Sequence, residues 1–382
     1  MVRLLSELTG SVYKRMLKPL LFLQKPDTIH TRLLRMGSLF QRVPAITWLI
    51  SSVWAYQNRS RLEQTIDGVT FSNPIGLSAG FDKNIQLPGI LQSVGFGFMT
   101  GGSVTHKQCA GNPRPWFYRL PKSKSLVVHV GLANDGASII RERLRSQPKK
   151  WLNNFPLVVS VAKTNSQETC NDTEAIADYV GSLEMFRNEP SVAAFEINIS
   201  CPNTYGGEPF TTPERLTQLL DAVDALQLQQ PVWVKMPINL PWKEFNALLG
   251  VITTHKILTV TIGNLNKDRA HTKLHDVLPD TMLGNLSGLP TQQLSDALIS
   301  KTYAAYGDRL HIIGVGGVFT AEDAYRKICL GASLVGLVTG VIFEGPQLIG
   351  QLNRELVELL EKDGFHDISQ AVGSKNPEPH KK

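Results

Sequence analysis

From residue 73 onward, runs of consecutive apolar residues alternate with segments whose apolar residues recur at helical spacing. The apolar runs are typical of strands buried on both faces of a parallel sheet. They cover residues 73–80, 96–104, 155–163, 192–200, 231–238, 257–264, 310–317 and 333–340. The helical patterns between most of them cover residues 172–188, 212–228, 242–254, 291–306 and 320–330. Eight βα units in one chain predict a (β/α)8 TIM barrel rather than an open sheet.

The first 64 residues have a different pattern, that of short amphipathic helices. Apolar residues recur at steps of three and four at Leu5, Leu8, Val12 and Met16. A second helix is predicted with Asp27 as its N-cap. A polar, proline-containing stretch at the other end of the chain is typical of disorder. The chain is therefore expected to contain a helical extension over residues 1–64, a barrel over 65–372 and a disordered tail over 373–382.

Basic charge is concentrated in the N-terminal extension. It holds ten Lys or Arg and three Asp or Glu, a net charge of +7, whereas the rest of the chain sums to −1. Because these basic residues lie among Leu, Phe and Trp, a membrane surface is favoured over nucleic acid as the partner. Two interpretations remain, a helical cap packed on the barrel and an interfacial element that docks on a membrane. No segment reaches the ~20 apolar residues that a membrane-spanning helix requires.

Glycine-rich turns follow the last two predicted strands. Gly314, Gly316 and Gly317 allow close approach of a ligand to the backbone, and Thr320 is a candidate N-cap of the next helix. Thr339 ends the last strand. Backbone N–H groups at these positions of a TIM barrel commonly bind phosphate. The alternative is a pair of structural turns, and neither interpretation names a reaction.

Six stretches together resemble the dihydroorotate dehydrogenase family, in register from about residue 10 to about residue 360. They are NPIGLSAGFDKN at 73–84, GGSVTHKQCAGNPRPWFYRLP at 101–121, EINISCPNT at 196–204, VWVKMP at 232–237, GNLSGLP at 284–290 and IIGVGG at 312–317. The extension, with KPLLFLQKPDTIHTRLLRM, resembles the membrane-associated, quinone-using class. The four cysteines lack metal-ligand spacing, which fits a reducing compartment and no metal site.

The resemblance implies FMN as the cofactor. Lys235 matches the family lysine beside the N1/O2 edge of the flavin, where an ammonium stabilises the negative charge of the reduced ring. The implied cofactor contacts are Ser78, Ala79, Gly80, Ser103, Ser160, Lys235, Ser287, Gly288, Gly316, Gly317 and Thr339.

The resemblance also implies a dihydropyrimidine site. The implied substrate contacts are Lys83, Asn198, Asn203 and Asn264. Amide side chains can pair with the alternating C=O and N–H edge of a pyrimidine, although Asn also forms turns. Cys201 stands at the position of the catalytic base, where a thiol that is partly ionised removes a proton better than a serine hydroxyl. The alternative for Cys201 is an inert, buried thiol.

Several positions depart from the family pattern. The quinone-using class normally carries Ser where this chain has Cys201, and usual polar residues are replaced at Val128, Leu265 and Ser160. An Asn-to-Val change leaves a polar group of the substrate without a partner, at a cost of about 1–3 kcal/mol in a dry site. The loop after Asn203 also lacks a usual basic residue.

Three hypotheses follow. The first is oxidation of dihydroorotate to orotate in pyrimidine biosynthesis, with electrons passed to a quinone by an enzyme peripheral to the cytoplasmic face of the inner membrane. The second is a related flavoenzyme acting on another dihydropyrimidine or cyclic amide. The third is an inactive FMN-binding, membrane-associated module.

Overall fold

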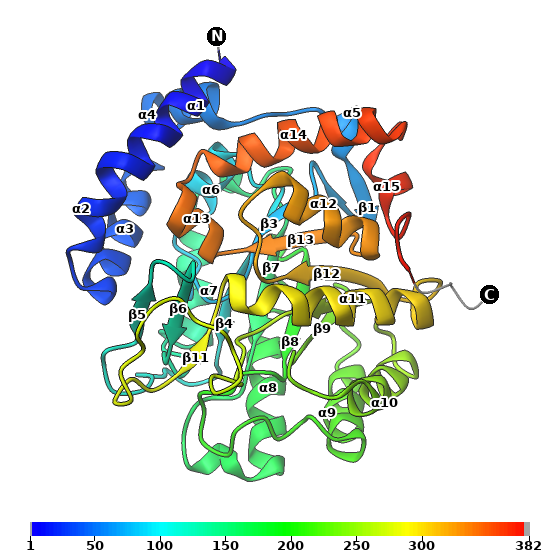
Figure 1. Cartoon of the computed structure of the whole chain (residues 1–382). Helices are drawn as coiled ribbons and strands as arrows, with labels where there is room; N and C mark the ends of the chain where they lie inside the picture. The colour runs from blue at the N-terminus through cyan, green and yellow to red at the C-terminus, as the bar shows by residue number, and fades with distance from the viewer. Residues whose placement is uncertain (1, 378–382) are drawn as a thin grey trace.

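The computed structural model describes residues 2–377 and has a closed barrel of eight parallel strands at its centre (Figure 1). Around the barrel the order is β10, β12, β13, β3, β4, β7, β8 and β9. Their bounds are β3 Ile75–Leu77, β4 Phe98–Val104, β7 Leu157–Val161, β8 Ala194–Asn198, β9 Val232–Met236, β10 Thr259–Ile262, β12 His311–Val315 and β13 Leu334–Leu337. Each lies inside one of the eight predicted strands, so the TIM-barrel prediction is confirmed.

Apolar side chains fill the amino-terminal end of the barrel. Phe98, Val158, Trp233 and Leu334 belong to one buried cluster, and each stands at or next to the start of its strand. A hairpin of β1 (Gln64–Ile66) and β2 (Val69–Phe71) adds Phe71 to this cluster. Because this end is packed shut, a ligand can enter only at the carboxyl ends of the strands.

The hairpin turn is held by backbone conformation and by side chains of the barrel. Asp67 and Gly68 both have positive φ, 51° and 78°, as a two-residue hairpin turn of this type requires. The Asp67 carboxylate accepts hydrogen bonds from the Trp233 indole at 2.8 Å and from the Thr259 hydroxyl at 2.6 Å. These bonds fix the hairpin against the closed end of the barrel.

The predicted barrel helices are all present. They are α8 Asp172–Phe186, α9 Pro213–Ala225, α10 Trp242–Thr253, α11 Gln292–Tyr306 and α12 Ala321–Leu330. Thr320 caps α12 as predicted, because its hydroxyl accepts from the N–H of Asp323 and the Asp323 carboxylate accepts from the N–H of Thr320. Further helices are α6 Pro88–Val94, α7 Ala137–Ser146, α13 Thr339–Glu344, α14 Leu348–Asp363 and α15 Ile368–Ala371.

A small antiparallel sheet that the sequence pattern did not predict lies beside the barrel. It contains β5 (Phe117–Leu120), β6 (Ser125–Val128) and β11 (Asn285–Leu286), in the order β11-β6-β5. Val128 pairs with Phe117 on one side and with Asn285 on the other. This sheet brings residues far apart in the sequence to one side of the strand ends.

The N-terminal helices α1 to α3 lie along one edge of the barrel (Figure 1, dark blue), whereas α5 lies beside α14 and α15. The helices of the extension are α1 Val2–Val12, a π-helix Tyr13–Leu17, α2 Lys18–Phe22, α3 Pro26–Phe40, α4 Pro44–Trp54 and α5 Arg59–Leu62. The prediction that Asp27 caps α3 was wrong. The helix begins at Pro26, and the Asp27 carboxylate instead accepts from the N–H of Trp116 at 3.0 Å.

The beginning of the predicted disordered tail is ordered. The N–H of Gly373 donates to the carbonyl of Ile328, and the Asn376 amide donates to the carbonyls of Ser300 and Leu330. Polar composition predicted disorder here, but these bonds to α11 and α12 hold residues 373–376. Residues 378–382 of the predicted tail lie outside the described residues.

Candidate functional site

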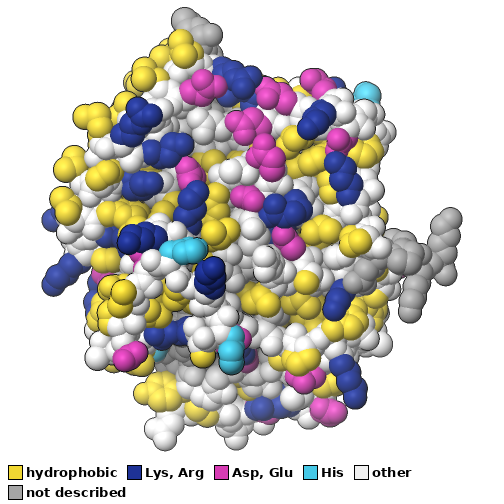
Figure 2. All heavy atoms as spheres, in the orientation of Figure 1, with side chains coloured by type: hydrophobic (Ala, Val, Ile, Leu, Met, Phe, Trp, Pro, Cys, Tyr) yellow, Lys and Arg dark blue, Asp and Glu magenta, His cyan; other side chains and the backbone are white. Residues whose placement is uncertain are grey.

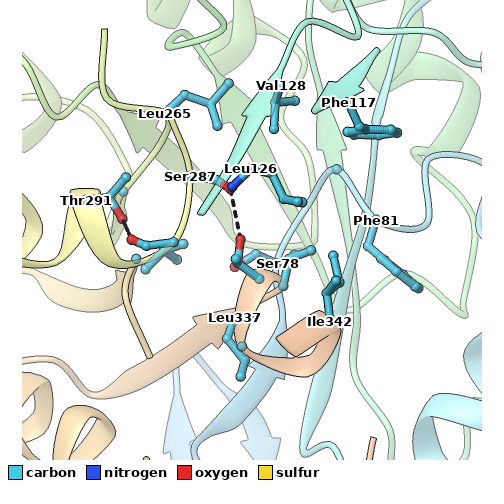
Figure 3. A pocket seen from close by; sticks show the side chains of 18 of the residues that line it. Ser78, Phe81, Phe117, Leu126, Val128, Leu265, Ser287, Thr291, Leu337 and Ile342 are labelled. Atoms are coloured by element: carbon cyan, nitrogen blue, oxygen red, sulfur yellow. Dashed lines mark hydrogen bonds between the residues drawn. The ribbon is translucent and has the colours of Figure 1, made fainter. Parts of the chain in front are cut away.

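A large cavity opens at the carboxyl ends of the barrel strands and extends to α3. Figure 3 shows part of its lining, with Ser78, Ser287 and Leu337 among the labelled residues. Its empty space, including the open mouth, is about 1150 Å³. Strand ends of the barrel supply its floor, β5 and β6 supply one wall, and Pro26, Ile29, His30 and Leu33 of α3 supply the outer part. The cavity therefore joins the strand ends to the N-terminal extension.

All but two of the predicted cofactor residues line this cavity. The lining set includes Ser78, Ala79, Gly80, Lys235, Ser287, Gly288, Gly316, Gly317 and Thr339. The hydroxyls of Ser287 and Thr339 are 3.0 Å apart and connect the residue after β11 to the first residue of α13. Ser103 and Ser160 are the exceptions. They lie buried behind the cavity with their hydroxyls 2.9 Å apart.

The cavity wall fits a flat, polar-edged cofactor that carries a phosphate. The Ser78 hydroxyl is buried and has no hydrogen-bond partner within residues 2–377, so it is available to a ligand. Gly80 has a φ of 111°, and a Cβ built there would meet nothing within 4 Å. Lys235 is 6% exposed, and none of the ion pairs among the described residues includes it. A buried ammonium in such a wall favours an anionic group in the cavity.

The glycines after β12 require a backbone that other residues rarely adopt. Gly316 and Gly317 have φ values of 116° and 68°. A Cβ on Gly316 would stand 2.5 Å from the Thr291 hydroxyl, and one on Gly317 would stand 2.4 Å from Cβ of Gln292. Both the conformation and the lack of space select glycine here, which leaves main-chain N–H groups next to the cavity.

The outer part of the cavity is mostly apolar. Phe117, Leu126 and Ile342 line it together with the α3 residues (Figure 3). His30 also lines it, and its Nε2 lies 2.9 Å from the carbonyl of Phe81. Burial lowers the pKa of His30 to about 3, so its ring is neutral at physiological pH. This region has the character of an entrance for an apolar molecule.

Arg119 is the cation of this entrance. Its guanidinium donates to the carbonyls of Phe22 and Gln24 at 3.1 and 2.6 Å and lies 4.6 Å from the centroid of the Phe22 ring. Burial lowers its pKa. The sequence did not single out Arg119 or His30. Arg119 lies inside the quoted 101–121 stretch, but only the packing of β5 against α3 shows that it faces the cavity.

The predicted substrate asparagines meet at the ends of β8 and β10. The Asn198 amide donates to the Ser103 hydroxyl at 2.8 Å, and its carbonyl accepts from the Ser200 hydroxyl at 3.1 Å. The Asn264 amide donates to the same Ser200 hydroxyl at 2.7 Å. Asn203 lies apart from them and donates to the carbonyl of Val128 at 3.0 Å. Among the three asparagines, only Asn264 lines the cavity.

Lys83 lies next to the cavity without lining it. Its ammonium donates to the carbonyl of Gly80 at 2.7 Å and lies 5.5 Å from the centroid of the Phe117 ring. Burial lowers its pKa to about 8, although the nearby carboxylates of Asp82 and Asp27 oppose this shift. Lys83 is therefore close to half-protonated in mildly alkaline solution.

Cys201 follows β8 and also lies outside the cavity lining. It is half-buried and packs against Cys109, Leu132 and Ala162. Burial raises the pKa of its thiol to about 11, although the N–H of Asn203 and the charge of Lys235 oppose the shift. The expectation of a partly ionised thiol near neutrality is therefore not met, because desolvation disfavours the thiolate.

Two of the three other residues that depart from the family pattern line the cavity, and the third is buried behind its wall. Val128 and Leu265 are half-buried, and both line the cavity beside Ser287 and Leu126 (Figure 3). They make this part of the wall apolar. Ser160 is fully buried behind the wall, where its hydroxyl bonds to Ser103. A buried carboxylate that sequence reasoning missed, Glu196, lies on β8 and accepts from the Thr261 hydroxyl at 2.7 Å.

Comparison with known proteins identifies the family. Residues 61–360 match the family model described as dihydroorotate dehydrogenase. A protein named dihydroorotate dehydrogenase (quinone) from Rippkaea orientalis is 36% identical, over 91% of this chain and 94% of that protein. A protein of the same name from Acaryochloris marina is 30% identical, over 95% and 100%.

Solved structures agree with the sequence relatives. Dihydroorotate dehydrogenase from Eimeria tenella in complex with ferulenol has a TM-score of 0.75 and 25% identity, over 87% of this chain and 94% of that one. The ligand-free form from the same organism has a TM-score of 0.76 and 24% identity, over 89% and 98%. This chain belongs to the dihydroorotate dehydrogenase family.

Proposed function

We propose that this chain oxidises dihydroorotate to orotate with FMN as cofactor and passes the electrons to a quinone. The observation that carries the proposal is the single cavity that runs from the glycine turns and Lys235 at the strand ends to the apolar surface of α3. Relatives named for this activity align over nearly the whole chain, including its N-terminal extension. One end of the cavity suits a phosphorylated cofactor, and the other suits an apolar electron acceptor.

The oxidation forms the C5=C6 double bond of orotate by removal of a proton from C5 and a hydride from C6. FMN supplies, when bound, the ring that accepts the hydride. The main-chain groups at Gly316 and Gly317 would hold the phosphate, and Ser78, Gly80 and Lys235 would hold the ring, since all five residues line the cavity. The ammonium of Lys235 stabilises negative charge that develops beside it during the reaction.

We assign proton removal to Cys201 and orientation of the substrate to Asn198, Asn203 and Asn264. Without substrate, the Asn264 amide donates to Ser200 and the Asn203 amide donates to the carbonyl of Val128. A bound substrate would replace these internal partners. Lys83 is the cation placed to meet the substrate carboxylate. Because the pKa of Cys201 is about 11, only a small fraction of the thiol is ionised at neutral pH.

We further propose that the N-terminal helices attach the protein to the cytoplasmic face of the inner membrane. Their exposed apolar residues include Leu4, Leu8, Met16, Leu20, Leu23, Leu39, Trp48 and Leu49. Figure 2 shows hydrophobic side chains interspersed with Lys and Arg along this edge, the pattern of an interfacial helix. Among residues 2–377, no helix combines the length and apolar character needed to cross a bilayer.

A second candidate substrate, another dihydropyrimidine or cyclic amide, is favoured by one observation. Val128 and Leu265 present aliphatic side chains to the cavity (Figure 3), and Leu265 follows Asn264, which also lines it. A substrate with fewer polar groups at this edge than dihydroorotate would leave fewer of them unpaired. The identity of the substrate is therefore the point that an assay must test first.

The test is a steady-state assay of the purified protein with dihydroorotate and a soluble quinone analogue, with dihydrouracil as the matched alternative substrate. We expect a flavin absorbance spectrum, bleaching by dihydroorotate without acceptor, and turnover with the quinone. Bleaching by dihydrouracil alone would transfer the assignment to the second candidate. Bound FMN that neither substrate reduces would support the inactive module, and a colourless protein would refute the cofactor.

A further inference from the structure

We infer that a second pocket, between the end of α3 and the barrel, binds the phosphate group of an anionic phospholipid. Its empty space, including the mouth, is about 1160 Å³, and it shares no lining residue with the cofactor cavity. The inference rests on the proposed membrane attachment and adds a specific site to it. The lining residues are Ser38, Gln41, Arg42, Gln86, Arg143, Ser146, Gln147, Pro148, Lys150 and Trp151.

The charge of the pocket wall is entirely positive. Arg42, Arg143 and Lys150 line it, and no Asp or Glu does. Arg42 and Lys150 are exposed, and neither forms an ion pair in the part of the chain that the structure describes. Arg143 is held in place by the Asp135 carboxylate at 2.6 Å and the carbonyl of Asn84 at 3.0 Å. Arg42 and Lys150, two cations on one hollow that lack a carboxylate partner among the described residues, favour an anion there.

The floor of the pocket is rigid before any ligand arrives. Gln41 is 4% exposed, and its amide donates to the carbonyl of Gln86 at 2.7 Å while its oxygen accepts from the N–H of Gly89 at 3.0 Å. The Gln147 amide donates to the carbonyl of Ile85 at 2.6 Å. A floor fixed in this way loses little conformational freedom on binding, so the two free cations can act on a defined position.

Exposed apolar residues next to the lining residues in the sequence favour one kind of anion. Leu39 and Phe40 stand between the lining residues Ser38 and Gln41, Val43 follows the lining residue Arg42, and the three are exposed at 62%, 39% and 43%. Inorganic phosphate would gain nothing from these side chains. A phospholipid would place its phosphate among the cations and its acyl chains along Leu39, Phe40 and Val43. Interfacial helices combine basic and apolar residues in the same way.

The test uses full-length, FMN-loaded protein and short-chain phosphatidylglycerol below its micelle concentration, with binding measured by calorimetry. The variant is R42Q/K150Q, and the matched control is R32Q/R35Q. The control removes the same charge from exposed positions of α3 outside the pocket. Charge-assisted hydrogen bonds contribute more per cation than general surface attraction. We therefore expect R42Q/K150Q to weaken lipid binding about tenfold more than the control does.

The outcomes separate the site from the membrane proposal and from catalysis. Equal losses in the two variants, or no saturable binding by the wild type, would overturn the pocket. Inorganic phosphate that binds as tightly as the lipid and competes with it would overturn the lipid assignment. Detergent-solubilised turnover and FMN content should be unchanged in both variants. Failure of the wild type to bind phosphatidylglycerol vesicles, with the short-chain lipid still bound at the pocket, would refute only the membrane attachment.

Discussion

The two ends of the cofactor cavity are built from different materials. The end next to β12 and β13 is made of main chain and small residues, with Gly316 and Gly317 in conformations that glycine alone adopts easily. The end next to β8 and β10 depends on side chains: Asn264 lines the cavity, and the Ser200 hydroxyl links it to Asn198, which does not line the cavity. A site made of main-chain groups keeps its ligand contacts when neighbouring side chains change. A site made of side chains gains or loses contacts with each substitution. Of the family departures that line the cavity, Leu265 follows Asn264 in the chain, and the main-chain carbonyl of Val128 accepts from Asn203.

The largest effect is expected from Cys201→Ala, which removes the proposed base from the side-chain end. General base catalysis contributes about 10²–10⁴-fold, so flavin reduction by dihydroorotate should slow by that factor. FMN should remain bound, because Cys201 does not line the cavity. Stopped-flow absorbance measures the first quantity and the flavin-to-protein ratio the second.

Cys109→Ala is the matched control, since Cys109 packs in the same small cluster as Cys201. It removes a similar volume without removing the proposed base. Similar losses of reduction rate in the two variants would assign the effect to packing and leave Cys201 without a catalytic role.

The next effect is at the main-chain end, in Gly80→Ala. A methyl group there would project into open space at the cavity wall, from a backbone with φ of 111°. Crowding of this kind costs about 1–3 kcal/mol, which corresponds to a roughly 5- to 150-fold weaker affinity for FMN. The measurement is the FMN dissociation constant of the apoprotein, followed by flavin fluorescence.

Gly68→Ala controls for backbone strain. Gly68 also has a positive φ, 78°, with nothing within 4 Å of a built Cβ, but it lies in the β1–β2 turn. This variant should lower thermal stability and leave FMN affinity unchanged. Weakened FMN binding in both variants would show that the effect of Gly80→Ala comes from general destabilisation.

The difference between the two ends also decides what the sequence could predict. The eight strands and the capped helix at Thr320 follow from local periodicity and capping, and all are present. The glycine turns were recognisable because φ and close packing restrict those positions to one residue type. Local sequence patterns therefore predicted the main-chain end of the cavity.

Long-range packing was beyond those patterns. The β5–β6–β11 sheet was missed because β11 has only two residues and pairs with β6 across more than 150 positions of sequence. Arg119 and His30 face the cavity only because α3 packs there. Asp27 was mistaken for a cap because its partner, the N–H of Trp116, lies 89 positions away. The burial that raises the pKa of Cys201 depends on the folded loop, so local sequence rules did not predict it.

The pH dependence provides a smaller effect, about tenfold per pH unit. Burial raises the pKa of Cys201 to about 11, so the thiolate fraction, and with it kcat limited by proton removal, should rise tenfold per unit below that value. Lys83, with a pKa lowered to about 8, loses its charge above pH 8. Substrate binding should weaken there, so kcat/KM should stop rising near pH 8 while kcat continues to rise. A plateau of the reduction rate below pH 8 would contradict the raised pKa of Cys201, and a plateau that persists in Cys201→Ala would contradict Cys201 as the base.

The smallest expected effect is the one that best distinguishes the two substrate assignments. Val128→Asn restores an amide at the apolar edge of the cavity, and the carbonyl of Val128 that accepts from Asn203 belongs to the main chain and stays. One added hydrogen bond contributes about 0.5–1.5 kcal/mol, so KM for dihydroorotate should fall roughly two- to tenfold. Turnover of dihydrouracil, measured in parallel, controls for general changes in the site. A different result would favour the second candidate substrate. If Val128→Asn raises KM for dihydroorotate, and if the wild type has a lower KM for dihydrouracil than for dihydroorotate, the aliphatic wall matches the less polar substrate. The side chains at one end of the cavity would then suit a different substrate, while the main-chain groups at the other end would still bind the same cofactor.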